Sequence, residues 1–337
     1  MRFLSDNTAT ICPELLEAIA QANHGAERAY GDDPWTLRLD AVLGEFFGTE
    51  VKAFAVTTGT AANALALATI TPPYGAVYAH DEAHIVRDEC GAPEFFSGGA
   101  RTVVLPGAHA KVTGDALLSA LEANPTSVHT VQPAALSITQ ATELGASYRP
   151  AEIAALSGLA HARGLKVHMD GARLANALAF LRCQPAESTW RAGIDVLSFG
   201  ATKNGALAAE AVVFFDRTLT RDFELRRKRA GHLLSKSRYA AAQLIAYVES
   251  GVWARNAERA NRLAQLLGHA AGQRLLHPVE ANEVFVKLGP QGKQRLRAAG
   301  FEFYDWGAEA SGEARFVVSW DQSPESVQAL AAALNGT

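Results

Sequence analysis

Two polar side chains follow a short apolar run in VHMDGAR, residues 167–173. Asp170 ends a run that is typical of a buried strand, and Arg173 follows three residues later. In open parallel sheets, ligands bind outside the carboxyl ends of the strands, so both side chains would lie where a ligand binds. The alternative is structural: Asp170 caps the next helix and Arg173 pairs with it.

A single lysine, Lys203, lies in LSFGATKNGALAAEAVVFF, residues 197–215. It follows the next strand candidate, 33 residues after Asp170. Pyridoxal phosphate requires such a pair, because a lysine amine forms its Schiff base and an acid keeps its ring nitrogen protonated. Taken alone, Lys203 is better explained as a surface cation after a strand. The pairing with Asp170 is what indicates a cofactor.

The segment TTGTAAN, residues 57–63, is typical of a turn that opens a helix. Backbone N–H groups at a helix N-terminus lack intrahelical partners and lie at the positive end of the helix dipole, which suits a phosphate. The natural donors are Gly59, Thr60 and Ala61. Many helices begin in this way, so the segment gains its meaning from a cofactor that carries a phosphate.

His84 lies among acidic residues in HDEAHIVRDECGA, residues 80–92. Its imidazole could stack on a cofactor ring or move a proton near neutral pH. The alternative is an ordinary surface histidine.

The bulk composition describes a globular protein. The 337 residues suffice for one large and one small domain, and 48% apolar with 20% charged residues is typical of an ordered chain. The net charge of −4 gives no reason to expect a nucleic-acid or membrane partner.

Cysteine usage and the first residues bear on the compartment. Cys12, Cys90 and Cys183 are widely spaced and form no CxxC pair, which argues against a disulfide framework or a metal site. The chain turns polar by its fifth residue, so no signal peptide is expected, and no apolar stretch reaches membrane-spanning length. We therefore predict a cytoplasmic protein without a structural metal.

Strand-like and helix-like segments alternate through most of the chain, which predicts an α/β protein with a mostly parallel sheet flanked by helices. The clearest are helices at 12–25, 37–48, 149–164 and 170–181, the strand–turn–helix segment 52–70, and strands at 165–170, 193–200 and 210–215. From about residue 239 a long helical stretch, 240–272, leads into a smaller α+β region. The predicted domains are an N-terminal arm (1–13), a large cofactor-binding domain (14–240) and a small C-terminal domain (241–337).

Taken together, these segments resemble the low-specificity L-threonine aldolases, within the β-eliminating-lyase group of fold-type-I pyridoxal-phosphate enzymes. The resemblance runs nearly end to end. Its pieces, in chain order, are SDN (5–7), YGDDPWT (30–36), TTGTAAN (57–63), DEAHI (81–85), HMDGAR (168–173), SFGATKNG (198–205) and ARFVVSW (314–320).

The resemblance implies a carbon–carbon lyase that uses pyridoxal 5′-phosphate to cleave L-threonine or L-allo-threonine to glycine and an aldehyde. Other reactions on the same scaffold stay open: phenylserine cleavage, β-elimination and racemisation. A rival from another class is a non-catalytic or nucleotide-binding α/β module. No G-x-G-x-x-G follows a strand here, so dinucleotide binding has little support.

The resemblance also implies roles at the cofactor. Lys203 carries the Schiff base, and Asp170 pairs with the pyridinium nitrogen. Arg173 lies near the phenolic oxygen, where it also reaches the substrate. Gly59 and Thr60 hold the phosphate.

Three further roles follow from the same resemblance. His84 stacks over the cofactor ring, and His84 or a water that it positions takes the β-hydroxyl proton. Ser5 and Arg315 bind the substrate carboxylate, Arg315 through a two-point contact that suits this group.

Subunit contacts are implied as well. In this family the arm with Ser5 and the YGDDPWT segment lie at subunit interfaces, which predicts a homo-oligomer, a dimer with shared active sites or a tetramer. The basic run RRKRAGHLLSK, residues 226–236, would then lend Lys228 or Arg229 to a neighbouring site; the alternative is a solvated helix face.

The chain departs from the family in two places. Many members carry ENTHN before HMDGAR, whereas this chain has SITQATELG, with Gln140 or Glu143 where the histidine would fall. The lysine segment is ATKNG rather than SKGLGAP. The group that handles the β-hydroxyl proton and the accepted side chains are therefore open.

Overall fold

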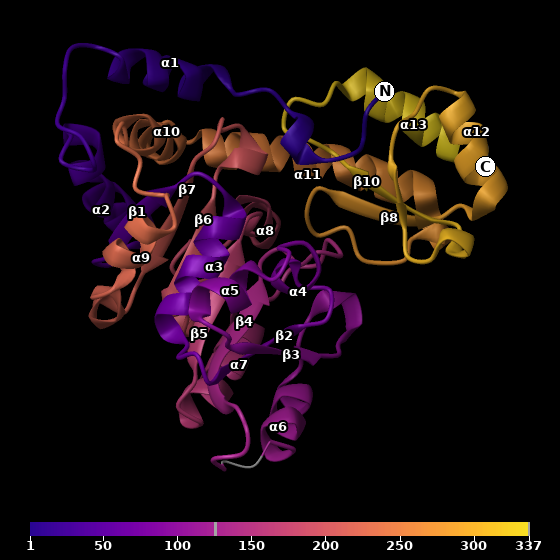
Figure 1. Ribbon diagram of the computed structural model, residues 1–337. Helices are drawn as coiled ribbons and strands as arrows, with labels where there is room; N and C mark the ends of the chain where they lie inside the picture. Colours follow the sequence, from indigo (N-terminus) through magenta and orange to yellow (C-terminus); the bar gives the residue numbers. More distant parts are fainter. Residues whose placement is uncertain (125–126, 336–337) are drawn as a thin grey trace.

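The computed structural model describes residues 1–124 and 127–335, and a seven-stranded sheet forms its centre (Figure 1). The strand order is β1-β7-β6-β5-β4-β2-β3. All neighbours pair in parallel except β7, which is antiparallel to both β1 and β6. The strands are β1 Lys52–Val56, β2 Gly75–His80, β3 Arg101–Leu105, β4 Gln132–Thr139, β5 Lys166–Gly171, β6 Val196–Gly200 and β7 Glu210–Phe214. The predicted mostly parallel sheet is confirmed.

Helices cover both faces of this sheet, because alternate residues of each strand point to opposite sides. In β7, Ala211 and Val213 belong to the same hydrophobic core as residues of α2, α7, α8 and α10, whereas Val212 and Phe214 belong to the core that includes α3 and α9. The helices in this part of the chain are α1 Pro13–Ala22, α2 Pro34–Phe47, α3 Gly59–Ile70, α4 His84–Arg87, α5 Ala92–Ser97, α6 Gly114–Glu122, α7 Pro150–Ala162, α8 Leu174–Leu181, α9 Phe223–Arg229 and α10 Arg238–Glu249.

A second, antiparallel sheet of three strands lies to one side, in the order β8-β10-β9 (Figure 1). Its core also takes in Phe3 of the N-terminal arm, whose N–H donates to the carbonyl of Glu302 over 2.8 Å. The elements of this region are α11 Val252–Ala271, β8 Glu283–Lys287, α12 Gly289–Ala298, β9 Tyr304–Trp306, β10 Glu313–Val317 and α13 Pro324–Asn335. The predicted small α+β region is thus present.

Several predicted boundaries differ from the structure; the helix predicted from residue 170, for example, begins at Leu174, because Asp170 and Gly171 still belong to β5. The helical stretch predicted over 240–272 is broken at Gly251, whose φ of 71° ends one helix and caps the next. Helix α2 begins at Pro34, inside the segment predicted as a loop, because Asp33 caps it through the N–H of Thr36. Helix α1 ends at Ala22 rather than at Gly25.

The predicted division at residue 240 falls inside α10, whose buried residues pack into the core of the large sheet. The three-part domain division stays a prediction. Along residues 1–124 and 127–335, no helix combines the length and the apolar character needed to cross a membrane.

Two glycines allow β5, β6 and the turns that follow them to approach closely. A Cβ on Gly200, the last residue of β6, would lie 2.7 Å from the Cα of Ala172. A Cβ on Gly171 would lie 2.8 Å from the carbonyl oxygen of Ser198. The close contact between neighbouring strands therefore requires a glycine at position 171.

Candidate active site

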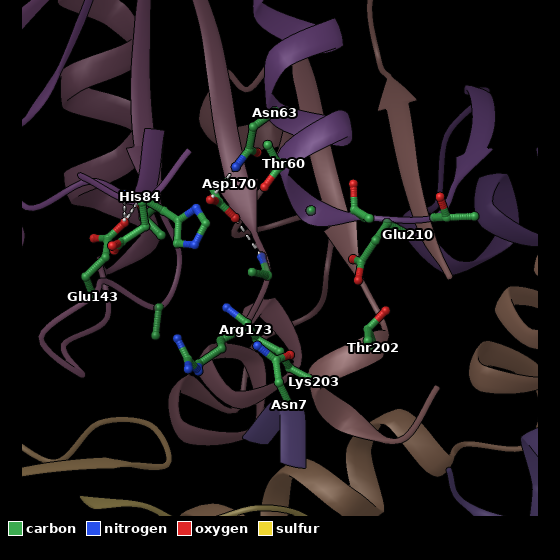
Figure 2. Close-up of a pocket in the computed structure, with 17 residues that line it drawn as sticks. Asn7, Thr60, Asn63, His84, Glu143, Asp170, Arg173, Thr202, Lys203 and Glu210 are labelled. Carbon is green, nitrogen blue, oxygen red and sulfur yellow. Dashed lines mark hydrogen bonds between the residues drawn. The ribbon is translucent and has the colours of Figure 1, made fainter. Parts of the chain in front are cut away.

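A cavity of about 410 Å³ lies where the carboxyl ends of β4 and β5 meet the start of α3 (Figure 2). Six predicted site residues line it: Gly59, Thr60, His84, Asp170, Arg173 and Lys203. Three others, Ser5, Ala61 and Arg315, do not. The remaining lining residues are Asn7, Thr57, Thr58, Asn63, Asp88, Thr139, Ala141, Glu143, Ala172, Thr202 and Glu210.

Asp170 is the penultimate residue of β5 and is only 4% exposed. Its Oδ2 accepts from Asn63 Nδ2 over 2.8 Å, and its Oδ1 accepts from the N–H of Ala172 over 2.9 Å. Burial alone would raise the pKa of this carboxyl, but the charges of His84 and Lys203, with the two hydrogen bonds, lower it below its usual value. Asp170 thus stabilises the turn after β5 through the N–H of Ala172 and also presents a stable negative charge to the cavity.

Lys203 lies in a 3₁₀ turn, η4 (Thr202–Asn204), that follows β6. Gly205 ends this turn with a φ of 118°. Within the described part of the chain, Lys203 Nζ has neither a hydrogen-bond nor an ion-pair partner, although the residue is half-buried and lines the cavity. Its amine is therefore available to a bound group.

The start of α3 offers backbone donors to the cavity. The Oγ of Thr58 caps the helix by accepting from the N–H of Ala61 over 3.1 Å. This bond occupies Ala61, so the predicted role of its amide as a phosphate donor is not supported. Gly59 and Thr60 hold the first two helical positions and have no acceptor within the helix. A Cβ on Gly59 would meet no atom within 4 Å, so open space lies beside these donors.

His84 opens α4 and is held by Glu89, which in turn bonds Asn63; sequence reasoning missed both of these buried residues. Its Nδ1 lies 2.8 Å from Glu89 Oε1, which also accepts from Asn63 Nδ2 over 2.8 Å. The hydrogen bond to Glu89 raises the pKa of His84 despite burial. Asn63 thereby connects Glu89 to Asp170. An asparagine inside the Ala/Leu-rich helix predicted after TTGT was the available signal for it.

Arg173 is bound by two acidic residues that were also missed. Its Nε donates to Asp6 Oδ2 over 2.8 Å and its Nη2 to Asp6 Oδ1 over 3.1 Å. Its Nη1 lies 3.3 Å from Glu283 Oε2 on β8. Arg173 therefore faces the cavity with its charge already compensated, and no local sequence pattern revealed either partner.

Ser5 and Arg315 do not line the cavity, although each contacts a residue close to it. The Oγ of Ser5 accepts from the N–H of Asn7, which lines the cavity in its place. Arg315 Nη1 lies 4.0 Å from Glu283 Oε1, and its guanidinium stacks 5.2 Å from the Trp306 ring centre. Lys228 contacts Tyr30, and neither Lys228 nor Arg229 lines the cavity.

Two residues of the segment 137–145, which replaces the family's histidine loop, lie in different environments. Gln140 is fully buried and bonds both ways with the backbone of Tyr148, outside the cavity. Glu143 lines the cavity beside His84, and burial with the nearby charge of Asp170 raises its pKa to about 7. Burial likewise raises the pKa of Glu210 to about 7 at the far side of Lys203 (Figure 2).

These groups fit pyridoxal phosphate. Within residues 1–124 and 127–335, the site offers a lysine amine without a partner, an ionised buried carboxylate and helix-start N–H groups without an acceptor in the helix. These match the carbonyl carbon, the ring nitrogen and the phosphate of the cofactor. No observation of the donor set conflicts with such a group.

The chain matches the family described as "Beta-eliminating lyase" over residues 2–290. It belongs to this family. It is 45% identical to a protein named "Low specificity L-threonine aldolase" in a Pseudomonas species and to another of that name in Pseudomonas aeruginosa, each alignment covering 98% of this chain and 96% of the relative. A solved threonine aldolase structure from Leishmania major superposes with a TM-score of 0.93 at 25% identity, over 99% of this chain and 98% of that one.

Family membership confirms three sequence-based predictions. The chain has the fold-type-I architecture, it is a carbon–carbon lyase of the threonine aldolase type, and its cofactor is pyridoxal 5′-phosphate.

Proposed function

We propose that this chain cleaves L-threonine and L-allo-threonine to glycine and an aldehyde. The observation that carries the proposal is that Lys203 and the ionised Asp170 line one cavity with Gly59 and Thr60, whose N–H groups have no acceptor within α3. Relatives at 45% identity that bear the name low-specificity L-threonine aldolase support the choice of substrate.

In this proposal, Lys203 Nζ would bind pyridoxal phosphate covalently and Asp170 would hold the proton on its ring nitrogen. Gly59 and Thr60 would donate to the phosphate, and His84 would cover the ring. When bound, the cofactor supplies an electron-withdrawing system that accepts the electron pair of the broken Cα–Cβ bond.

The substrate carboxylate would be bound by Arg173, whose position is fixed by Asp6. We also propose Ser5 and Arg315 as further contacts of the substrate carboxylate. Neither lines the cavity: the Oγ of Ser5 accepts from the N–H of Asn7, and Arg315 Nη1 lies 4.0 Å from Glu283 Oε1. Closing on a substrate would require Arg315 to exchange this contact for the substrate carboxylate.

Aldehyde release tests the proposal. The purified protein should be yellow and should release acetaldehyde from both threonine diastereomers, whereas Lys203→Ala should lose both the colour and the turnover. Cleavage of phenylserine alone, formation of a keto acid and ammonia, or change of configuration at Cα would replace the proposed reaction by one of its alternatives. A protein that stays colourless after addition of the cofactor would contradict the proposal.

We further propose a cytoplasmic homo-oligomer, a dimer with shared sites or a tetramer. Phe95 and Leu225 are 79% and 71% exposed and line one surface cavity between α5 and α9, which favours a subunit contact there. Lys228 or Arg229 of one protomer would then reach the site of its partner. Light scattering and mixing of inactive Lys203 and Lys228 variants test this arrangement.

A further inference from the structure

Glu143 has one carboxylate oxygen that is held in place and one that is free. Its Oε1 accepts from the N–H of His84 over 2.9 Å and from Thr139 Oγ1 over 2.7 Å. Its Oε2 is buried and, among residues 1–124 and 127–335, has no hydrogen-bond partner. A buried oxygen without a partner is costly, so a position beside a ligand O–H would satisfy it.

The other groups proposed for the β-hydroxyl proton are less suited to accept it. Gln140 is bound to the backbone of Tyr148 and does not line the cavity. His84 uses Nδ1 for its bond to Glu89, which raises the pKa of the imidazole. A histidine that keeps its proton is a donor, and it cannot act as a base in that state.

We propose that Glu143 Oε2 accepts the β-hydroxyl proton of the substrate while the Cα–Cβ bond breaks. This assignment rests on the proposed aldolase function. The O–H bond breaks and its electron pair becomes the second bond of the aldehyde carbonyl. The electron pair of the Cα–Cβ bond ends in the new Cα–H bond of glycine, whose proton comes from solvent. Glu143 then releases its proton to water as the aldehyde leaves.

The surroundings of Glu143 match this task. Burial and the charge of Asp170 raise the pKa of its carboxyl to about 7, while the bonds from Thr139 and His84 act in the opposite direction. The other charged or titratable groups that face it are the His84 ring, Arg173 and the Tyr148 phenol. A carboxylate with a pKa near the working pH is an efficient general base. Figure 2 shows it beside His84, at the end of the cavity away from Glu210.

Glu143→Gln tests the assignment, because glutamine keeps the side-chain length and an oxygen for His84 and Thr139 but accepts no proton. We expect kcat for aldehyde release from L-threonine to fall by about 10²-fold or more. Exchange of the glycine α-proton in D₂O, followed by NMR, involves no β-hydroxyl and should stay close to wild type. The affinity for glycine, followed by the change in visible absorption, should also persist.

The pH profile separates a base from a structural residue. Wild-type kcat should rise with pH through the titration of Glu143, and this limb should be absent in Glu143→Gln. Glu143→Asp should recover part of the lost rate, and it also decides the question if the glutamine variant does not fold. Glu82→Gln is a matched control near His84, since Glu82 pairs with Arg87 over 3.3 Å and lies outside the cavity lining.

Three outcomes would overturn the assignment. The first is aldehyde release by Glu143→Gln at the wild-type rate. The second is a loss of glycine α-proton exchange in this variant as large as its loss of aldehyde release. The third is a Glu143→Asp variant that releases aldehyde no faster than Glu143→Gln. Each would leave the proposed function intact as long as the wild-type protein releases aldehyde. If the wild-type protein cleaves no β-hydroxy amino acid, the proposed function fails and this assignment with it.

Discussion

Asp6 and Arg173 form a buried two-point ion pair that joins the N-terminal arm to the turn after β5. The two contacts span 2.8 and 3.1 Å, and Asp6 also accepts from Asn282 Nδ2 over 3.1 Å. Asn7, the next residue of the arm, lines the cavity. The arm is therefore part of the wall of the site, and its attachment fixes the guanidinium proposed to bind the substrate carboxylate.

Asp6→Asn should lower the free energy of unfolding at neutral pH by about 3 kcal/mol, because it leaves Arg173 buried with an incomplete counter-charge. Burial would raise the pKa of Asp6, but Arg173, Lys203 and Asn282 lower it below its ordinary value of 3.8. The stabilisation is therefore complete above that value and is lost as the pH falls through the lower, folded-state pKa. Urea unfolding at a series of pH values measures the difference.

The exposed pair between Arg2 of the same arm and Glu302 of the small region provides the control for this experiment. Glu302→Gln should cost less than about 1 kcal/mol, since both side chains are solvated. A deficit in Asp6→Asn that does not change between neutral and acid pH would contradict the role given to Asp6.

Asp170→Asn should keep the covalent attachment at Lys203, and so the visible colour, while kcat falls by about 10²- to 10³-fold through loss of a charge placed at the reacting centre. Aldehyde release and the absorption spectrum measure the two properties separately. Asp216→Asn is the control, because Asp216 pairs with Lys166 at the opposite end of β5. Full activity in Asp170→Asn would remove the electrostatic role of this residue.

The strands of the large sheet and the polar residues at their ends could be predicted because their sequence signals are local. Apolar runs predicted β5, β6 and β7, and the ends of two of those runs located Asp170 and Lys203. The break at Gly251 was missed although glycine commonly ends a helix, and the left-handed φ of this residue separates α10 from α11.

The partners of the predicted residues lie far away in the chain and carry no local signal. Asp6 and Arg173 are 167 residues apart, and Glu283 reaches Arg173 from another sheet. Glu89 and Glu143 both lie in segments that the motifs had marked, but only the fold shows which carboxylate turns into the cavity. Sequence thus predicted six residues that line one cavity, and tertiary packing decided their charges and orientation.

Gly59→Val should weaken binding of pyridoxal phosphate by about tenfold, equivalent to about 1.4 kcal/mol, without destabilising the protein that lacks it. The reason is that a Cβ at this position meets no protein atom within 4 Å, so the added methyl groups extend into space proposed for the phosphate. Titration of the cofactor-free protein with pyridoxal phosphate, followed by absorption, measures the affinity.

Thr58→Ala is the complementary variant. It removes the cap of α3 without filling that space, so it should cost about 1 kcal/mol of stability. Equal affinity in Gly59→Val and the wild-type protein would place the phosphate elsewhere.

Gly200→Ala should destabilise the protein by about 1 to 3 kcal/mol, because the new methyl group would lie 2.7 Å from the Cα of Ala172 and 2.9 Å from its carbonyl oxygen. These are backbone atoms, so relief requires β6 to move away from the chain that follows β5. Lys203 lies three residues after Gly200, and the shift should therefore reduce kcat as well.

Gly158→Ala, on an exposed part of α7 where a Cβ meets nothing within 4 Å, should instead stabilise the protein by up to about 1 kcal/mol. Thermal unfolding and aldehyde release of the two variants measure both effects, and unchanged values for Gly200→Ala would show that the position of Lys203 tolerates a wider spacing of β5 and β6.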